Sequence, residues 1–447
     1  MRRCLPALLA LCALSTACGP SGDARSPTRA PLASQWLERA KASYRSGDFD
    51  DARESSKKAL EAAPSDPDAR ELAARISLIR LDYAEALQLT EGLSSSQAHG
   101  IRGRAYWLSG DVEHAADELE ALLADPSVKD SWAHDVAGLA RRGVGRHPFA
   151  MDGAQVAAVD VPRAIERVPL GAAIVVPCEL DGERVLALMA TGASEVLLDS
   201  NSRHEAAWVS FRFDRVEISD VPALVQDLSP ISRQLGVPIK AMIGAQLLRH
   251  AHTTFDRRGD QFIVRRRDAP PPPDASRVPL FYMRGGGMVL RATVTTRDEG
   301  AIPFYVDSSR NFPLLLKDSA WQKAGVDVRS LSSLPDTPSV KTGIVPTFRM
   351  GGFDLAKMPA LEGIDMTELA AGTDVDLAGV VGADLLSFFR VTFADDGRFI
   401  WIEPDPSLLG QVPPPDAPAG APPPSSSAPS QPAPAPPVSA PPSAPKR

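Results

Sequence analysis

The chain has 447 residues, of which 44% are hydrophobic and 23% are charged, and its formal net charge is −8. A chain of this length and composition is expected to fold into more than one soluble globular domain. Its acidic balance argues against a nucleic-acid partner, because binding to phosphate groups requires a basic surface.

Residues 1–18 are typical of a secretory signal peptide. They comprise a basic start, an apolar run from Leu5 to Leu14, and small residues that end at Cys18. This ending resembles the lipid-attachment site of bacterial lipoproteins, which implies lipidation of Cys18 and a place in the bacterial cell envelope. By the same resemblance, Gly19 implies the outer membrane, facing the periplasm; the alternative is a secreted protein. The apolar run is too short to cross a bilayer, so the membrane anchor would be lipid alone.

Cysteine and histidine usage predicts no metal site and no cofactor. Three of the four cysteines lie in the signal segment, so processing leaves Cys178, without a partner for an intrachain disulfide. Because Cys178 stands in an apolar strand pattern, we expect a buried core thiol. His250 and His252 have the spacing that places two imidazoles on one face of a strand, but no third ligand accompanies them.

A helical region is predicted at 34–145, after a linker at 19–33 that is rich in Ser, Pro, Gly and Ala. In the helical region a short motif occurs three times, as Gly47–Ala52, Leu81–Ala86 and Gly110–Ala115. Its period and its small residues resemble the tetratricopeptide repeat. Stacked repeats of this kind offer a concave surface to a peptide or partner protein. The alternative is a helical spacer without a ligand.

Two β-rich regions follow, at 157–267 and 277–404, separated by a Pro-rich break at 268–276. In both regions apolar residues alternate with polar ones and are interrupted by Gly, Asp and Pro, which is typical of strands and turns. Residues 405–447 consist mostly of Pro, Ala and Ser and cannot bury a core. We expect a disordered, polyproline-like tail there.

The stretch Val185–Leu198 consists of an apolar strand, a tight turn and a second apolar strand. Its centre, Ala190-Thr191-Gly192-Ala-Ser, resembles the active-site loop of retropepsin-like aspartic proteases, whose signature is Asp-Thr-Gly-Ala-Ser. The resemblance implies that Thr191 and Gly192 support a catalytic loop. It also implies that Ala190 stands where the family has its catalytic aspartate, so this half-site is degenerate.

The second β region carries a matching half-site, Asp307-Ser308-Ser309. It resembles the Asp-Ser-Gly variant of the same loop, in which the serine hydroxyl replaces that of threonine. The resemblance makes Asp307 the candidate catalytic residue, with Ser308 as its supporting hydroxyl. Ser309 replaces the glycine, at a position where the family needs close backbone approach or a positive φ.

A second motif recurs downstream in each β region. Gly244 and Gly382 each follow two apolar residues and precede Ala-x-Leu-Leu, and a Thr-Phe pair starts ten residues after each glycine. This element resembles the second half of the retropepsin-like unit, in which the glycine lets the segment pass beneath the catalytic loop. The resemblance covers roughly 165–404. It implies a multidomain α + β chain, with tetratricopeptide-like helices followed by an all-β, two-lobed, aspartic-protease-like domain.

Aspartic proteases use two carboxylates that share one proton, so that one acts as base while the other acts as acid. Three arrangements follow for Asp307. It pairs with Ala190 in the same chain and is inactive, or it pairs with a second Asp307 across an active homodimer, or it is an exposed turn residue on a scaffold. We favour the first, because a short linker makes pairing within one chain far more frequent.

The sequence is therefore interpreted as an envelope lipoprotein with an inactive aspartic-protease-like domain that binds an extended peptide or a partner protein. One alternative is an active aspartic peptidase that pairs Asp307 across a homodimer. Another is a structural envelope adaptor that acts through the helical repeats. The oligomeric state stays open.

Overall fold

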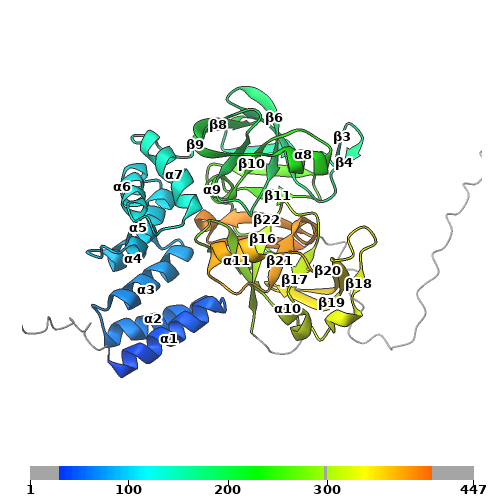
Figure 1. Cartoon of the computed structure of the whole chain (residues 1–447). Coiled ribbons are helices and arrows are strands. Elements are labelled where there is room, and N and C mark those ends of the chain that lie inside the picture. The colour runs from blue at the N-terminus through cyan, green and yellow to red at the C-terminus, as the bar shows by residue number, and fades with distance from the viewer. Residues whose placement is uncertain (1–29, 296–299, 405–447) are drawn as a thin grey trace, which may run out of the picture. The chain divides into compact units, whose positions relative to one another are not determined.

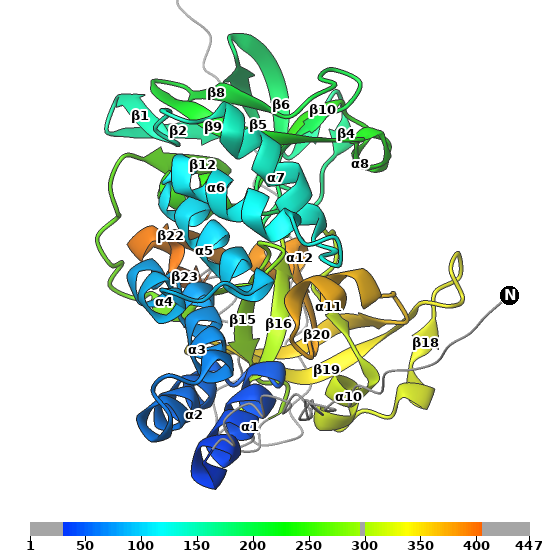
Figure 2. The same ribbon diagram turned by 60° about the vertical axis from the view of Figure 1, so that its left-hand side comes forward.

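The computed structural model describes residues 30–295 and 300–404. The predicted signal peptide with Cys18 and the Pro-rich tail at 405–447 lie outside the described residues and stay predictions. The helices and the two β lobes described below belong to one compact unit, which Figures 1 and 2 show from two sides. None of the described helices is long and apolar enough to cross a membrane.

Seven consecutive helices begin the described part of the chain, coloured blue to cyan in Figure 1. Small and apolar side chains fill the space between them: Leu37, Ala52 and Ala59 have no exposed surface. The rings of Tyr44 and Phe49 meet edge to face with their centroids 5.9 Å apart. The helices are α1 (Pro31–Arg45), α2 (Phe49–Ala62), α3 (Pro67–Ile79), α4 (Tyr83–Thr90), α5 (Ser96–Ser109), α6 (Val112–Leu123) and α7 (Ser131–Arg142).

The three copies of the repeat motif begin at equivalent turns. Gly47 and Gly110 follow α1 and α5 with φ angles of 74° and 87°, and Leu81 follows α3 with a φ of 62°. A left-handed φ favours glycine, because a side chain crowds the backbone in that conformation. The Leu81 side chain is buried in the core. The second repeat therefore keeps the shared turn without glycine, and burial of an apolar side chain offsets the local strain.

The helical region starts earlier than predicted. Helix α1 begins at Pro31, whereas the sequence pattern placed the linker through residue 33. Proline suits the first turn of a helix, because its fixed φ is helical and the N–H it lacks would have no partner there. The proline that marked a linker in the sequence therefore starts the helix.

The first lobe contains a seven-stranded sheet with the order β1-β9-β7-β10-β6-β5-β8, and β8 also pairs with β9, so that the sheet closes on itself. The first lobe starts before residue 157, its predicted start, because strand β1 belongs to its sheet through pairing with β9. The sequence of β1 shows no apolar alternation, so the pattern did not predict this strand. The elements are β1 (Ala150–Gly153), β3 (Ala164–Ile165), β4 (Val168–Pro169), β5 (Val175–Leu180), β6 (Glu183–Met189), β7 (Val196–Asp199), β8 (Ala207–Phe213), β9 (Val216–Gln226), α8 (Ser229–Leu235), β10 (Ile239–Ile243) and α9 (Ala245–His250).

The second lobe contains an eight-stranded sheet with the order β14-β15-β16-β21-β17-β20-β19-β18. Figure 1 shows most of it in yellow. The elements are β14 (Phe281–Tyr282), β15 (Met288–Ala292), β16 (Ile302–Asp307), β17 (Leu314–Leu316), α10 (Asp318–Lys323), η1 (Val328–Ser330), β18 (Ser332–Ser333), β19 (Lys341–Met350), β20 (Phe353–Glu362), α11 (Thr367–Thr373), β21 (Gly379–Gly382) and α12 (Ala383–Leu386).

The centres of the two sheets have the same connectivity. In the first lobe β6 runs parallel to β10, β10 runs antiparallel to β7, and β7 runs parallel to β9. In the second lobe β16, β21, β17 and β20 repeat these pairings in the same order. Each lobe therefore places one loop, after β6 or after β16, beside a neighbouring strand: β10, which precedes Gly244, or β21, which ends at Gly382.

A six-stranded sheet joins the lobes, with the order β13-β23-β22-β11-β12-β2. At its centre the two Thr-Phe segments of the sequence pair antiparallel, with Thr254 opposite Thr392 and their hydroxyls 2.9 Å apart. The segments that recur in the sequence are thus neighbours in space. The elements are β2 (Val156–Asp160), β11 (Thr254–Asp256), β12 (Gln261–Arg265), β13 (Ser276–Pro279), β22 (Phe389–Ala394), η2 (Asp395–Gly397) and β23 (Phe399–Pro404).

His250 and His252, whose spacing would suit one face of a strand, do not lie on a strand. His250 is the last residue of helix α9 and stacks on the ring of Phe149, with centroids 4.4 Å apart, while His252 lies in the turn that follows. Cys178 is a free, buried thiol, and burial raises its pKa to about 12. Across residues 30–295 and 300–404, no group of three or more His, Cys, Asp or Glu residues is placed to hold a metal ion.

Two leucines of helix α1 test the packing of the helical region. Leu37 has no exposed surface, whereas Leu32 is 57% exposed. We expect Leu37→Ala to lower the free energy of unfolding by about 2–5 kcal/mol, because it leaves a cavity. Leu32→Ala should change it by less than about 0.5 kcal/mol. Urea unfolding followed by far-UV circular dichroism measures both, and equal effects would contradict this packing.

Candidate functional site

The loops that follow β6 and β16 meet face to face, and two hydroxyl side chains join them. Thr191 N donates to Ser308 Oγ at 3.1 Å, and Ser308 N donates to Thr191 Oγ1 at 2.9 Å. Thr191 Oγ1 donates in turn to the carbonyl of Val306 at 3.1 Å, and Ser308 Oγ to that of Met189 at 2.8 Å. Thr191 and Ser308 are both buried. We call this reciprocal set of four hydrogen bonds the Thr191–Ser308 clamp.

Gly244 and Gly382 lie directly against these loops. A Cβ on Gly244 would collide with the carbonyl oxygen of Glu195, and one on Gly382 would collide with the carbonyl oxygen of Phe312. The residue after each glycine donates its N–H to the loop, from Ala245 to Ala193 O and from Ala383 to Arg310 O, both at 2.8 Å. Glycine at both positions therefore permits the close backbone contact that supports each loop.

Asp307 carries the carboxylate that faces the other loop. A Cβ built on Gly192 would lie 2.7 Å from Asp307 Cγ, so the carboxylate packs on the backbone of the turn that follows Ala190. Asp307 is 7% exposed and Ala190 1%. The alternative that Asp307 is an exposed turn residue is therefore wrong, because its loop is covered by the loop of the first lobe.

The oxygens of Asp307 already accept three hydrogen bonds from its own loop. Oδ1 accepts from Ser309 N at 3.0 Å and from Ser309 Oγ at 2.6 Å, and Oδ2 accepts from Arg310 Nε at 3.2 Å. Ser309 has no positive φ, so the strain expected for a side chain at this position is absent. Ser309, which replaces the signature glycine, instead donates its hydroxyl to the Asp307 carboxylate.

Tyr305, on strand β16, adds a further link between the loops. Its hydroxyl donates to the carbonyl of Gly192 at 2.6 Å. Burial, and to a smaller extent the nearby Asp307 carboxylate, raise the pKa of Tyr305. The phenol therefore keeps its proton and continues to donate. With one carboxylate opposite a methyl group, the site lacks the second carboxyl group that acid–base catalysis by a shared proton requires.

The helical region contacts the first lobe directly behind this loop, a feature that the sequence did not reveal. Trp107 Nε1 donates to Glu195 Oε1 at 2.7 Å, and Arg249 donates to the carbonyl of Leu108 at 2.6 Å. Burial raises the pKa of Glu195, against the opposing effect of the nearby Ser194, Trp107 and Trp132 side chains. The one signal for this contact in the sequence was an acidic residue, Glu195, directly before an apolar strand.

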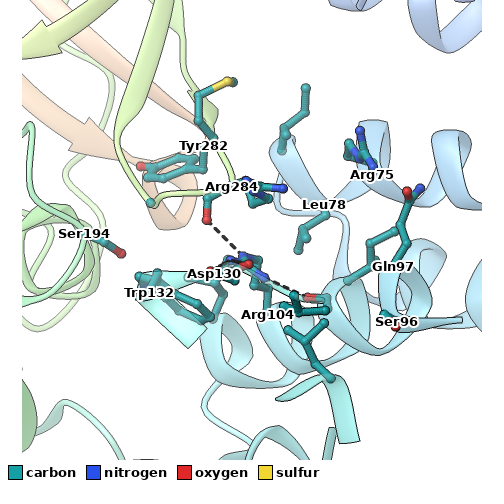
Figure 3. A pocket seen from close by; sticks show the side chains of 18 of the residues that line it. Arg75, Leu78, Ser96, Gln97, Arg104, Asp130, Trp132, Ser194, Tyr282 and Arg284 are labelled. Carbon is teal, nitrogen blue, oxygen red and sulfur yellow. Dashed lines mark hydrogen bonds and ion pairs between the residues drawn. The ribbon is translucent and has the colours of Figure 1, made fainter. Parts of the chain in front are cut away.

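A pocket lies beside Glu195, between the helical region and the two lobes (Figure 3). Its volume is about 230 Å³. In Figure 3 Arg104 stands between Asp130 and Arg284: it binds both oxygens of the Asp130 carboxylate, at 2.7 and 2.9 Å, and donates to the carbonyl of Arg284 at 2.9 Å. The ion pair joins α5 to the start of α7, and the hydrogen bond to Arg284 joins α5 to the β14–β15 turn. We call this cavity the composite pocket.

Comparison with known proteins supports the helical part of the fold. Residues 33–76 match the tetratricopeptide repeat family model, and no curated protein sequence matches the chain. The chain is thus a multidomain α + β protein, in which a tetratricopeptide-like helical region precedes a β-rich domain, as predicted.

Three solved structures illustrate what the chain is similar to. The first tetratricopeptide domain of human RPAP3 aligns at 20% identity over 25% of this chain and 91% of that chain, with a TM-score of 0.23. The OM64 tetratricopeptide domain of Arabidopsis aligns at 18% identity over 25% and 96%, with a TM-score of 0.24. A retropepsin-like aspartic protease from Rickettsia conorii aligns at 17% identity over 30% and 95%, with a TM-score of 0.23.

Removing one hydroxyl tests the clamp. We expect Thr191→Val to lower the free energy of unfolding of the β domain by about 2–5 kcal/mol, because Ser308 N and Val306 O lose their buried partner. The exposed Thr337→Val is the matched control and should change it by less than about 0.5 kcal/mol. The shift of the urea midpoint measures both variants. If the two behave alike, the clamp does not hold the lobes together.

Glu195 predicts a specific pH dependence of stability. Burial raises the pKa of Glu195 above 4.5, its usual value, so the folded chain binds this proton more tightly than the unfolded chain. Stability from this group is present below pH 4.5 and falls as pH rises through the folded-state pKa. Glu195→Gln keeps an acceptor for Trp107 but removes the titration. Its melting temperature should match the native chain at acidic pH and exceed it increasingly towards pH 8.

The control for this experiment is Glu113→Gln, an exposed glutamate of helix α6. Its melting curve should run parallel to that of the native chain at every pH. If the melting temperature of Glu195→Gln also ran parallel to that of the native chain, Glu195 would have the same pKa in the folded and unfolded states, which contradicts the prediction.

Proposed function

We propose that this chain is a non-catalytic relative of the aspartic proteases that binds an extended peptide or a partner protein. The observation that carries the proposal is the single carboxylate at the centre of the paired loops. Asp307 lies against the loop of Ala190, and its oxygens accept hydrogen bonds from Ser309 and Arg310. The acid is thus without a second carboxylate, and each of its oxygens already accepts a hydrogen bond.

The alternative of an active homodimer requires Asp307 to meet a second Asp307. In this chain Ser308 has already formed its clamp with Thr191, and Thr254 pairs with Thr392 between the lobes. A second copy would have to replace these buried hydrogen bonds and open the six-stranded sheet. Pairing within one chain avoids that loss, which supports the non-catalytic proposal.

The proposal places the chain in the bacterial envelope, anchored by lipid at Cys18 and facing the periplasm. It rests on the sequence of residues 1–18 alone. Retention of tetratricopeptide-like helices against a protease-like domain supports a binding role, because stacked helical repeats offer extended surfaces to peptides.

A cleavage experiment tests the loss of catalysis. The native chain, Asp307→Asn and a double variant, Ala190→Asp with Ser309→Gly, are incubated with a mixed peptide library between pH 3 and pH 7. We expect the native chain and Asp307→Asn to show the same background. The double variant should cleave roughly 10³-fold faster, because it restores both carboxylates and removes the competing hydroxyl.

The matched control is Ala190→Asn with Ser309→Gly, which has the same size but lacks the second carboxylate, and it should stay at background. Pepstatin should inhibit the restored activity. The non-catalytic proposal is falsified if the native chain shows pepstatin-sensitive cleavage that Asp307→Asn abolishes.

A further inference from the structure

The composite pocket is separate from the Asp307 loop and has apolar walls from the helical region and the second lobe, while the first lobe contributes Ser194 and Gln246. Neither Asp307 nor Ala190 lines it. Helices α3, α5 and α6 contribute one wall, and the β14–β15 turn of the second lobe contributes the other. The apolar side chains that line it include Leu78, Ile101, Leu108, Leu122, Tyr282 and Met283.

Four side chains that line this pocket each have a buried polar atom without a hydrogen-bond partner among the described residues: Tyr44, Trp132, Ser194 and Gln246. Such an atom costs about 1–3 kcal/mol of stability unless something else binds it. A cluster of them around one cavity is expected where a ligand supplies the missing partners.

Gln246 is the most informative of the four. It is 2% exposed, and its Oε1 accepts a hydrogen bond from Arg249 Nε at 2.8 Å, so the atom left over is the Nε2 donor. Ser194 is also buried, and Figure 3 shows its side chain pointing toward Trp132. The Ser194 and Trp132 side chains lie near the Glu195 carboxyl and interact with it instead of a ligand. Gln246 Nε2 and the Tyr44 hydroxyl are therefore the donors that remain for a ligand, which suits a ligand with carbonyl oxygens.

The shape of the pocket favours a chain-like ligand. A second cavity of about 650 Å³ lies along α1 and α3, and Tyr44, Arg75, Gln97 and Arg284 line both cavities. A peptide in extended conformation is long enough to occupy one cavity with a side chain and to run along the other. An extended peptide also presents carbonyl oxygens on both sides of each side chain.

We propose that the composite pocket holds one bulky apolar side chain of an extended peptide, whose adjacent carbonyl oxygen accepts a hydrogen bond from Gln246 Nε2. This rests on the proposed binding function and names where recognition takes place. The helical repeats and the protease-like lobes then form one binding site, since each contributes a wall that the other cannot replace. The Asp307 loop takes no part in it.

Fluorescence anisotropy with the full-length chain tests this proposal. The probes are two labelled nonapeptides of Ser, Thr and Ala that differ at the central residue, which is Phe or Gly. The native chain should bind the Phe peptide about 10- to 100-fold more tightly, because the ring leaves water for an apolar pocket. Ile101→Trp fills the cavity and should abolish this preference. Ile344→Trp, a substitution at an exposed isoleucine, should preserve it.

A second variant tests the hydrogen bond. Gln246→Glu keeps the oxygen that accepts from Arg249 but replaces the free N–H donor. It should weaken the affinity for both peptides by about 3- to 10-fold without changing the ratio of the two affinities. Gln322→Glu, at an exposed glutamine of helix α10 that does not line the pocket, is its control and should have no effect. Circular dichroism confirms that each variant is folded.

The outcomes separate the two proposals. If the native chain prefers the Phe peptide and Ile101→Trp retains that preference, peptide binding stands and the composite pocket is not its site. If neither peptide binds the native chain at millimolar concentration, both proposals are wrong. An unchanged affinity in Gln246→Glu would remove the assigned hydrogen bond and overturn the stated mode of recognition.

Discussion

The reciprocal clamp between Thr191 and Ser308 is the interaction on which the rest of the structure depends. Each residue uses its hydroxyl as donor and acceptor at once, and both loops are buried where they meet. Buried polar groups are costly when unpaired, so two loops that satisfy each other cannot separate without losing several hydrogen bonds together. The clamp also brings the loop that follows Ala190 against Asp307, so the candidate site contains one carboxylate.

The two halves of this site differ from the protease signature in ways that complement each other. In an active aspartic protease the two catalytic carboxylates lie close together and repel each other, so the folded enzyme carries an electrostatic cost. A methyl group at Ala190 removes the repulsion. On the other side, Ser309 binds Asp307 through its hydroxyl and its N–H, and Arg310 adds a charged donor from a mostly exposed side chain. Exposed ion pairs contribute little to stability. The partly buried hydroxyl contact is thus the stronger reason that Asp307 is held within its own loop.

The helical region does more than precede the β domain. Trp107 binds Glu195 just after the protease-like signature, Arg249 binds the carbonyl of Leu108, and Arg104 binds the carbonyl of Arg284. These contacts come from a single helix, α5, and they reach both lobes. An uncharged Glu195 is the form that burial favours. The same interface surrounds the composite pocket, whose lining includes buried polar atoms without a partner among the described residues.

The sequence by itself determined the features that depend on near neighbours along the chain. Helical periodicity, the shared turn of the repeats and the strand–turn–strand pattern around Thr191 and Ser308 are local, because backbone conformation and one-sided burial act over a few residues. It did not show the strand β1, the hydroxyl of Ser309 on Asp307, or the bond between Trp107 and Glu195. Trp107 and Glu195 are 88 residues apart, and Thr191 and Ser308 are 117 apart. Only the tertiary structure decides such contacts, because they form when separately folded segments pack and bury each other's polar groups.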